Sequence, residues 1–382
     1  MKQGWEKKKL GEVVKLEYGK PLSDGKRNIH GVYPVYGANG VKGRTNEFFY
    51  NKRTIIIGRK GSAGELNLTE EKFWPLDVTY FVTFDEKKYN LIFLYYLMSL
   101  LELPKLAKGV KPGINRNEVY SISAHIPPLF EQQRIVSILD EAFATIAKAK
   151  ANAEQNLKNT KELFESYLQS VFASKGEGWE EIRIEDIIRS NIIGIIKNTR
   201  EQHIDYSYKY FKMNNITRDN RLDLSKYTCV NATKEEVFKY CLAQKDFLFN
   251  TRNSYELVGK TCLFEGFEDE DVLYNNNIMR IRFIESIDPS FINYSFKTKN
   301  IIKKLNILKS GTTNVSAIYY KDFKNLTLLI PSLHYQKCIV QKLDALSSEI
   351  KKLESIYQQK ITDLEELKKS ILLKAFNGEL TT

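Results

Sequence analysis

A segment of 47 residues occurs twice in this chain of 382 residues, and the repeat limits the possible folds more than any other feature. Residues 126–172 align with residues 330–376 without a gap at an offset of 204, and 16 positions are identical. The matches include polar residues, such as Gln132 and Gln336, as well as apolar ones. The sequences ahead of the two copies also correspond, although loosely. A repeat of this kind indicates that one structural unit is used twice.

Both copies are predicted to be long helices. Neither 129–172 nor 333–376 contains Pro or Gly, and apolar residues recur at alternating spacings of three and four for more than four heptads. This pattern is typical of a coiled coil, so we expect a pseudo-twofold, antiparallel pair within the chain, with Asn156 and Lys360 near the middle of the seam. Two separate amphipathic helices, each docked on its own domain, are the alternative. The predicted seam residues are Ile135, Leu139, Ile146, Ala153, Asn156, Leu163, Ile339, Leu343, Ile350, Tyr357, Lys360 and Leu367.

The two variable regions are predicted to be α+β domains of common origin. In each, short strands bounded by turn residues precede one helix, a loop that contains glycine and a last strand. We expect strands at 13–18, 54–58, 77–84 and 121–126 with a helix at 91–101, then strands at 208–213, 246–250, 258–264, 277–283 and 325–330 with a helix at 289–305. The predicted segments are therefore two domains of mixed α/β structure, 1–127 and 177–330, and two helical segments, 128–176 and 331–382.

The basic charge of the chain lies mainly in the first variable region. The whole chain has a formal charge of +11, of which residues 1–125 contribute +8 and residues 177–329 contribute +2. The two repeated helices are close to neutral, which is typical of a scaffold or a protein-binding surface. A basic globular domain favours a polyanionic partner, and nucleic acid is the commonest one.

Several classes of protein are disfavoured by what the sequence lacks. The longest apolar run, 91–101, is about half of the ~20 residues that cross a bilayer, so no membrane is expected and a cytoplasmic location is predicted. Four scattered cysteines and four isolated histidines form no zinc or nucleophile pattern, and no glycine-rich phosphate loop occurs between a strand and a helix. We therefore expect neither a metal site nor catalysis by this chain.

Polar loops that contain glycine occur at corresponding places in both variable regions. Arg pairs with guanine and Asn with adenine, while Ser, Thr and Lys hold phosphates, so these loops are candidates for reading DNA. Each loop taken alone could also be an ordinary turn. The predicted DNA-binding residues are Tyr36, Asn39, Lys42, Arg44, Arg59, Lys60, Ser62, Lys111, Asn115, Arg116, Asn250, Thr251, Arg252, Asn253, Asn276, Thr312, Thr313 and Asn314.

The order of variable and repeated segments, together with four motifs, resembles the specificity subunit of Type I restriction-modification enzymes. The motifs are YPVYGANG at 33–40, IIIGRKGS at 55–62, IPPLFEQQRIV at 126–136 and LVGK at 257–260. The resemblance covers essentially the whole chain, and the paired helix starts are its most specific part. The second start departs from the first, because His334 and Tyr335 stand where the first copy has Phe130 and Glu131.

This resemblance implies a function for every segment. Each variable region would be a target-recognition domain that reads one half of a bipartite target in double-stranded DNA, and the two helices would set the spacing between the halves. Two methylation subunits and the restriction and translocation subunits would be the partners. They, and not this chain, would use S-adenosylmethionine, ATP and Mg, so the chain itself would be a non-catalytic subunit that directs adenine methylation and restriction. The alternative is a coiled-coil adaptor that binds proteins and does not read DNA.

Overall fold

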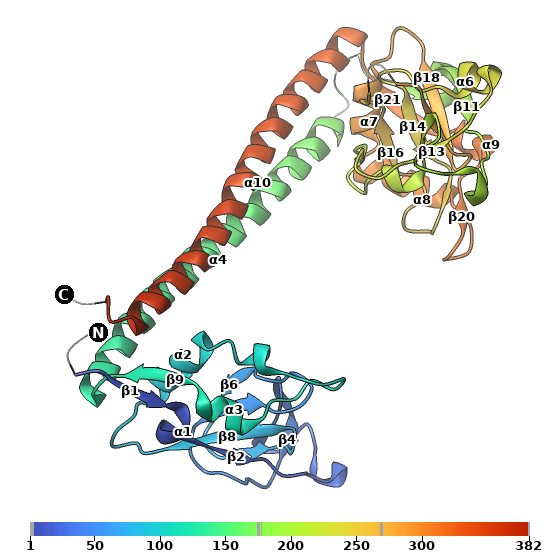
Figure 1. Cartoon of the computed structure of the whole chain (residues 1–382). Helices are drawn as coiled ribbons and strands as arrows, with labels where there is room; N and C mark the ends of the chain where they lie inside the picture. Colours follow the sequence, from blue (N-terminus) through green and yellow to red (C-terminus); the bar gives the residue numbers. More distant parts are fainter. Residues whose placement is uncertain (1–3, 174–175, 177, 268–269, 381–382) are drawn as a thin grey trace. The chain divides into compact units, whose positions relative to one another are not determined.

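The computed structural model describes residues 4–173, 176, 178–267 and 270–380, and these fall into two compact units. Unit 1 comprises Met1–Gln155 and Tyr357–Thr382, and unit 2 comprises Asn156–Ile356. Each of the two long helices, α4 (Leu129–Ala173) and α10 (Leu333–Phe376), is divided between the units (Figure 1). The units therefore do not follow the predicted segments, in which each helix stood by itself.

Unit 1 is built on a four-stranded antiparallel sheet in the order β2-β8-β5-β6. A second sheet, β4-β3-β7, and the pair β1-β9 complete it. Its strands are β1 (Glu6–Lys9), β2 (Val14–Tyr18), β3 (Tyr33–Gly37), β4 (Gly40–Thr45), β5 (Ile55–Gly58), β6 (Leu66–Leu68), β7 (Trp74–Pro75), β8 (Thr79–Phe84) and β9 (Ser123–Ile126). Its helices, besides the long ones, are α1 (Leu10–Val13), α2 (Leu91–Leu100) and α3 (Arg116–Ser121), with 3-10 turns at Asp24–Lys26 and Leu103–Leu106.

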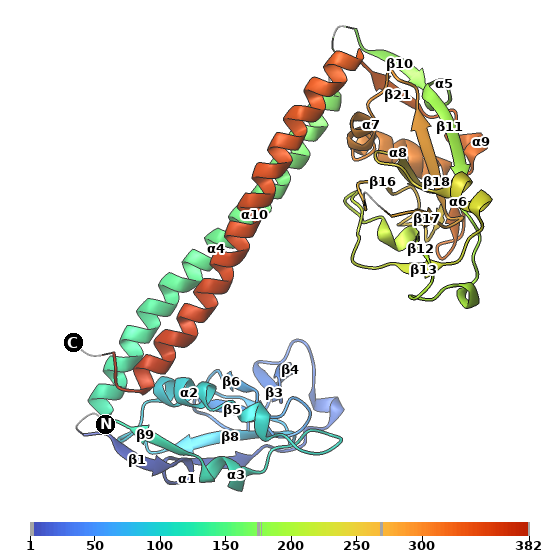
Figure 2. The same cartoon turned by 45° about the horizontal axis from the view of Figure 1, so that its top comes forward.

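Unit 2 repeats this plan with one further small sheet, and its main sheet has the order β11-β18-β14-β16 (Figure 2). The strands are β10 (Glu180–Arg183), β11 (Ile188–Ile193), β12 (Tyr208–Phe211), β13 (Thr228–Val230), β14 (Phe247–Asn250), β15 (Arg252–Asn253), β16 (Thr261–Leu263), β17 (Val272–Tyr274), β18 (Ile278–Phe283), β19 (Ser310–Gly311), β20 (Ser316–Ala317) and β21 (Thr327–Ile330). The short helices are α5 (Ile184–Ile187), α6 (Lys234–Tyr240), α7 (Pro289–Ser295), α8 (Lys299–Leu308) and α9 (Tyr320–Phe323), with 3-10 turns at Thr199–Glu201 and Met213–Asn215.

The sheets of the two units correspond strand by strand. In the second sheet of unit 1, β3 pairs antiparallel with β4 and parallel with β7, and in unit 2 β12 pairs in the same two ways with β13 and β17. The pair β1-β9 likewise corresponds to β10-β21. The prediction of two α+β domains with an internal repeat is confirmed.

One predicted helix is wrong. The segment 289–305 forms two helices, α7 and α8, because Thr298 begins a new one: its hydroxyl accepts a hydrogen bond from the backbone N–H of Ile301 at 3.4 Å. A threonine at this position caps a helix N-terminus and so favours a break in the chain direction. The break leaves Lys297 between the two helices.

The long helices pack antiparallel in unit 1. The ammonium of Lys368 on α10 lies 4.9 Å from the centre of the Phe143 ring on α4, and Lys150 forms a 2.6 Å ion pair with Glu365. Residue numbers thus rise along α4 as they fall along α10. The same end of α10 supplies Ala375, which is buried in the core of this unit.

In unit 2, the other ends of the two helices share a core with the sheet. Leu168 of α4 and Leu343 of α10 are both buried in this core, and the Phe172 ring lies 5.1 Å from that of Phe291 on α7. Apolar contact of this kind accounts for most of the stability of a surface helix. The predicted pairing of long helices is therefore present, and each helix end is also docked on a domain.

The predicted seam is correct in its first half and wrong in its second. Ile135, Leu139, Ile146 and Ala153 are buried, and so are Leu343 and Ile350, whereas Ile339 and Tyr357 are half-buried. The structure contradicts the remaining positions because Asn156 and Lys360 are exposed, as are Leu163 (58% exposed) and Leu367 (47% exposed).

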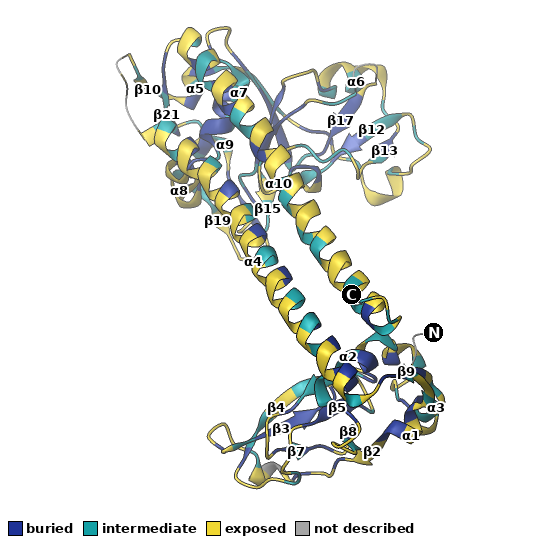
Figure 3. Ribbon diagram, turned by 90° about the vertical axis from the view of Figure 1, so that its left-hand side faces the viewer, coloured by how far each residue is buried: buried dark blue, intermediate teal, exposed yellow. Residues whose placement is uncertain are grey.

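The seam shifts because an α-helix has 3.6 residues per turn and not the 3.5 of a strict heptad. After Ala153, the buried or half-buried positions on α4 are Leu157, Thr160, Phe164, Leu168, Gln169, Val171 and Phe172. Figure 3 shows the result, with isolated buried residues on helices that are otherwise largely exposed. Within the part of the chain that the structure describes, no helix combines the length and the apolar character needed to cross a bilayer.

Candidate nucleic-acid interface

Two loops of unit 1 lie side by side, and both contain predicted DNA-binding residues. The first follows β5 at residues 59–64, and the second leads into α3 at residues 108–115. The Gly61 N–H donates to the Pro112 carbonyl at 2.9 Å, and the Ile114 N–H donates to the Arg59 carbonyl at 3.0 Å. Gly61 has a φ of +81°, a conformation that glycine adopts without strain and that lets the first loop turn.

An aromatic and cationic cluster lies beside these loops. The Tyr18 ring, at the end of β2, is 47% exposed, and the guanidinium carbons of Arg59 and Arg116 lie 5.3 and 5.2 Å from its centre. The buried Tyr80 ring supports Tyr18 edge-on at 5.1 Å. Burial raises the pKa of Tyr80, and its neighbour Tyr18 raises it further, so the Tyr80 hydroxyl stays neutral. The exposed Tyr18 ring therefore makes cation–π contacts with two arginines.

Not all of the cationic side chains in this cluster are equally free. The Arg59 guanidinium donates to the Asp77 carbonyl at 3.0 and 2.7 Å, which fixes its orientation. Lys60 and Lys111 are exposed, whereas Lys108 forms a 2.5 Å ion pair with Glu118. The cluster therefore combines an oriented arginine with exposed lysines.

The turn between β3 and β4 lies near the same loops. A Cβ atom added to Gly58 would lie 2.9 Å from the Ala38 carbonyl oxygen, which places the turn against the end of β5. Asn39 and Lys42 are exposed on this turn and on β4, and Ser62 is half-buried in the first loop. The structure thus brings most of the predicted residues of unit 1 to one end of its sheets.

Unit 2 contains the same pair of loops. The Ile318 N–H donates to the Thr251 carbonyl at 2.9 Å, as Ile114 does to Arg59 in unit 1, and the two isoleucines are 204 residues apart. Arg252 pairs with Ala317, as Lys60 does with Gly113. Thr251 is therefore the counterpart of Arg59, and Arg252 is the counterpart of Lys60.

The second loop of unit 2 is closed by its own hydrogen bonds. The Thr312 N–H donates to the Val315 carbonyl at 2.9 Å, and the Thr312 hydroxyl accepts from the Val315 N–H at 3.3 Å. The Thr313 carbonyl accepts from the N–H of Tyr255 at 3.0 Å, which ties this loop to the first one. Thr312, Thr313 and Asn314 are all exposed.

Some predicted residues build the loops instead of facing solvent. Tyr36 is 5% exposed and its hydroxyl accepts from the Glu70 N–H at 3.2 Å. Asn250 is fully buried, and its amide donates to the Arg252 and Asn277 carbonyls at 3.0 and 2.9 Å. Because they are buried, neither side chain can contact DNA, which contradicts that expectation for both.

Three further predicted residues use their side chains locally. Arg44 donates to the Gly31 carbonyl at 2.7 Å, and Asn115 caps α3 by accepting from the Asn117 N–H at 2.9 Å. Asn253 donates to the Asn250 side chain at 2.9 Å. Asn276 and Thr251 are half-buried. Tyr18, whose ring lies beside Arg59 and Arg116, was not among the predicted residues, although an aromatic residue that ends a strand beside a glycine and a lysine is a usable signal.

No group of three or more His, Cys, Asp or Glu side chains suited to a metal ion occurs among the residues that the structure describes. The four cysteines are free thiols.

Comparison with known proteins agrees with the repeated architecture. The family model of the Type I restriction modification DNA specificity domain matches residues 2–159 and again residues 176–362. The specificity subunit of the type I restriction enzyme EcoKI from Escherichia coli K12 is 24% identical to this chain. The aligned region covers 72% of this chain and 65% of the EcoKI subunit. A putative type I specificity subunit of Mycoplasma pneumoniae is 25% identical over 88% of both chains.

A solved structure shows the same fold. A chain from a study of complex assembly and conformational transition of the type I R-M system matches 100% of this chain and 99% of its own length, with a TM-score of 0.78 at 18% identity. Because the two matches of the family model together cover most of the sequence, one in each half, the chain belongs to the family of Type I restriction modification DNA specificity domains.

Proposed function

We propose that this chain is the DNA sequence-specificity subunit of a Type I restriction-modification complex and that each unit reads one half of a bipartite target. The observation that carries the proposal is the repeated loop pair. Lys60 beside Gly113 in unit 1 and Arg252 beside Ala317 in unit 2 present a cation at equivalent positions of two equivalent domains. Two similar readers in one chain suit a target made of two half-sites.

The chemistry of unit 1 suits both the phosphates and the base edges of DNA. Arg116 lies on the exposed Tyr18 ring, Arg59 is oriented by the Asp77 carbonyl, and Lys60 and Lys111 are free to reach phosphates. Oriented arginines read guanine, while flexible lysines neutralise the backbone. The +8 charge of residues 1–125 supports the same assignment.

Unit 2 would read its half-site with fewer charges and more neutral donors. Arg252 is exposed, and the loop that carries Thr312, Thr313 and Asn314 is exposed beside it. Hydroxyl and amide groups can pair with base edges or phosphate oxygens. The buried Asn250 would hold the loop in shape and make no contact with DNA.

The exposed faces of the long helices support binding of partner proteins. Large apolar side chains that project to solvent mark interaction sites when they occur together. The exposed large apolar residues of these helices are Phe130, Leu367 and Leu373 in unit 1, and Leu163, Tyr167, Tyr335, Leu353 and Ile356 in unit 2. We assign these residues to contacts with two methylation subunits, with restriction and translocation subunits joining the complex in the cytoplasm.

The chain itself would be non-catalytic. S-adenosylmethionine, ATP and Mg would be bound by the partner subunits, and the adenine to be methylated would be flipped into a pocket of the methylation subunit. The length of the helices between the two readers would set the spacer between the half-sites.

Genome-wide mapping of methylated adenines tests the proposal. Cells that express this chain with its own methylation subunits should carry the mark at one bipartite sequence, and cells that lack this chain should lose it. Exchange of residues 4–126 for those of another family member should change one half of the motif. Methylation without sequence preference in the complete complex would overturn the proposal.

A further inference from the structure

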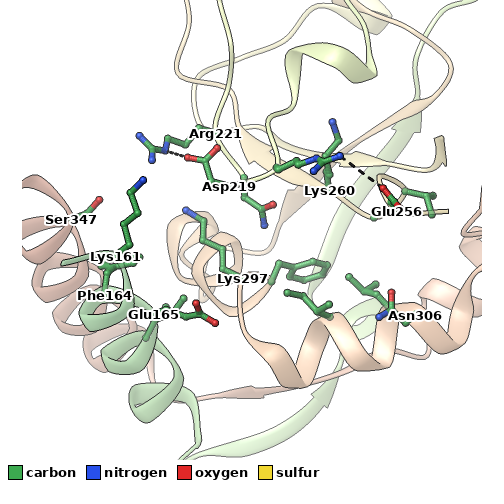
Figure 4. A pocket seen from close by; sticks show the side chains of 18 of the residues that line it. Lys161, Phe164, Glu165, Asp219, Arg221, Glu256, Lys260, Lys297, Asn306 and Ser347 are labelled. Atoms are coloured by element: carbon green, nitrogen blue, oxygen red, sulfur yellow. Dashed lines mark ion pairs between the residues drawn. The ribbon is translucent and has the colours of Figure 1, made fainter. Parts of the chain in front are cut away.

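Unit 2 contains two adjoining cavities of about 870 and 500 Å³. The larger one lies among the last part of α4, helix α8, the loop at residues 218–221 and the first part of α10 (Figure 4). Its volume is within the range of sites that hold small ligands. The two cavities share five lining residues, namely Asn220, Arg221, Lys297, Ser347 and Lys351.

The two repeats differ at residues that line this space. In unit 1, Phe143 packs edge-on against Tyr96 with ring centres 5.4 Å apart. Unit 2 keeps the tyrosine as Tyr294, but the residue 204 positions after Phe143 is Ser347, which is too small to fill the volume of the ring. Three residues after each tyrosine, Ser99 of unit 1 is replaced by Lys297 in unit 2. In unit 2, a serine thus stands in place of the aromatic ring of Phe143, and a lysine stands in place of Ser99.

Some of the cations at this wall make no ion pair among the described residues, whereas Arg221 pairs with Asp219. The ion pairs of the described residues leave Lys161, Lys297 and Lys351 without a carboxylate partner. The acidic residues of the two linings include three with ion-pair partners: Glu165 with Lys299 at 3.2 Å, Asp219 with Arg221, and Glu256 with Arg218. Asp344 accepts a hydrogen bond from Tyr294, and Glu265 and Glu354 also lie in the linings. Figure 4 shows the Lys161 and Lys297 side chains extending toward the side of the cavity on which Arg221 lies.

Lys297 is held in place by its surroundings. Its ammonium lies 5.0 Å from the centre of the Tyr294 ring, and burial lowers its pKa to about 8. Asp219 and Asp344 offset only part of the effect of burial, so a bound anion would further stabilise the charged form of this lysine.

Apolar side chains also line the larger cavity. Phe164 and Leu168 of α4, with Phe296, Ile302 and Leu305, line it. A ligand that fills this space therefore needs an anionic end and a flat or apolar end.

We propose that this cavity binds an organic phosphate of nucleotide size, with the phosphate at Arg221, Lys297 and Lys351 and the ring against the apolar side chains of the lining. The Ser347 hydroxyl can donate to a phosphate oxygen. A free nucleotide and a nucleotide of a DNA strand carry this same chemistry. The inference does not depend on the proposed role in DNA specificity.

Calorimetric titration of the full-length protein with ADP, adenosine and inorganic pyrophosphate tests the proposal. ADP should bind saturably at one site per chain, and adenosine should bind at least tenfold more weakly because it lacks the charge. Lys297→Gln should weaken ADP binding about tenfold, and Ser347→Phe, which restores the residue of unit 1, should abolish it. Lys303→Gln changes an exposed lysine on α8 outside the lining and should have no effect.

Absence of saturable ADP binding, or equal affinity in the Ser347→Phe variant, would overturn the proposal. Should that variant not fold, Lys351→Gln replaces an exposed lysine and should still weaken binding several-fold. A short single-stranded oligonucleotide that displaces ADP would assign the site to a DNA strand, and failure to displace would assign it to a free nucleotide. Methylation mapping reads DNA specificity separately, so the two proposals fail independently.

Discussion

The hydroxyl of Tyr294 donates a hydrogen bond of 2.6 Å to the carboxylate of Asp344, and so joins α7 to the long helix α10. In unit 1, Tyr96 donates to Asp140 of α4 at the same distance. Burial and the neighbouring carboxylate raise the pKa of both tyrosines, so both remain donors at neutral pH. The repeat is therefore conserved down to single hydrogen bonds, at the places where each domain meets its helix.

A buried glutamine also connects each domain to its long helix through hydrogen bonds. The Gln132 side chain accepts from the Asn90 N–H at 2.8 Å and donates to the Lys88 and Pro127 carbonyls at 3.0 and 2.8 Å. Gln336 makes the same three bonds in unit 2. Because Gln132 is fully buried, its loss would leave polar backbone groups without partners.

We predict that Gln132→Leu destabilises unit 1 by about 2–3 kcal/mol, because unsatisfied buried groups cost this much. Hydrogen exchange should accelerate in α2 and at the start of α4 and remain unchanged in unit 2. Gln133→Leu is the matched control, since the neighbouring glutamine is exposed. Equal effects of the two substitutions would contradict the structural role of Gln132.

The repeat was predictable because the two copies align without a gap. Both long helices and most strands were predictable because the spacing of apolar residues and the positions of prolines determine secondary structure locally. The seam beyond Ala153 was not predictable from a strict heptad, since the helix periodicity and the docking of unit 2 both shift the contact face. The burial of Asn250 was not predicted, because a polar residue at the end of a strand, beside a polar loop, is expected to be exposed. The equivalence of Lys60 and Arg252 could be recognised only from the strand pairing in the structure.

We predict that Arg252→Ala weakens DNA binding of the complete complex by about 1–3 kcal/mol and relaxes the motif at one half-site only. Lys60→Ala should affect the other half-site and lower the salt dependence of binding by about one ion. Binding to duplexes with either half-site scrambled, measured at several salt concentrations, separates these effects. Lys87→Ala, at an exposed lysine of unit 1 outside the loops, is the control. A change in both half-sites from one substitution would refute the assignment.

Tyr18 is predicted to act through its ring and not through its hydroxyl. Tyr18→Ala removes the surface on which Arg59 and Arg116 rest, so DNA affinity should fall about tenfold, consistent with a contact of this type. Tyr18→Phe keeps the ring and should stay within about twofold of the natural protein. Binding to the target of unit 1 measures both. If the phenylalanine variant were as weak as the alanine variant, the hydroxyl and not the ring would be responsible.

Lys297 should make the stability of unit 2 depend on pH. Its pKa of about 8 in the folded chain is below the ordinary 10.5, and Asp219, Arg221, Asp344 and Lys351 are the charged groups that act on it. Between these two pKa values the unfolded chain binds more protons than the folded chain, so the free energy of unfolding rises with pH. The destabilisation caused by burying the charged lysine is fully present below pH 8.

Lys297→Met should therefore stabilise unit 2 by about 1–2 kcal/mol at pH 7, which is less than the full shift implies because the side chain is partly solvated. The gain should shrink as the pH rises from 8 toward 10. Denaturation midpoints across this range, with Lys303→Met for comparison, provide the measurement. A gain that does not depend on pH would assign the effect to apolar packing and not to the charge.

The proposed spacer function of the helices predicts the result of a paired insertion. Seven residues placed after Ala149 in α4, with seven placed after Glu365 in α10, lengthen both helices at positions that face each other, since Lys150 and Glu365 are 2.6 Å apart. A heptad keeps the same face toward the partner helix and adds about 10 Å at 1.5 Å per residue. This length corresponds to about three base pairs of DNA at 3.4 Å per step. The methylated motif should keep both half-sites and gain that number of spacer positions. The same insertion in α4 alone makes the two paired helices unequal in length, so it should lower the free energy of unfolding instead. An unchanged spacer in the paired variant would show that something other than these helices sets the distance.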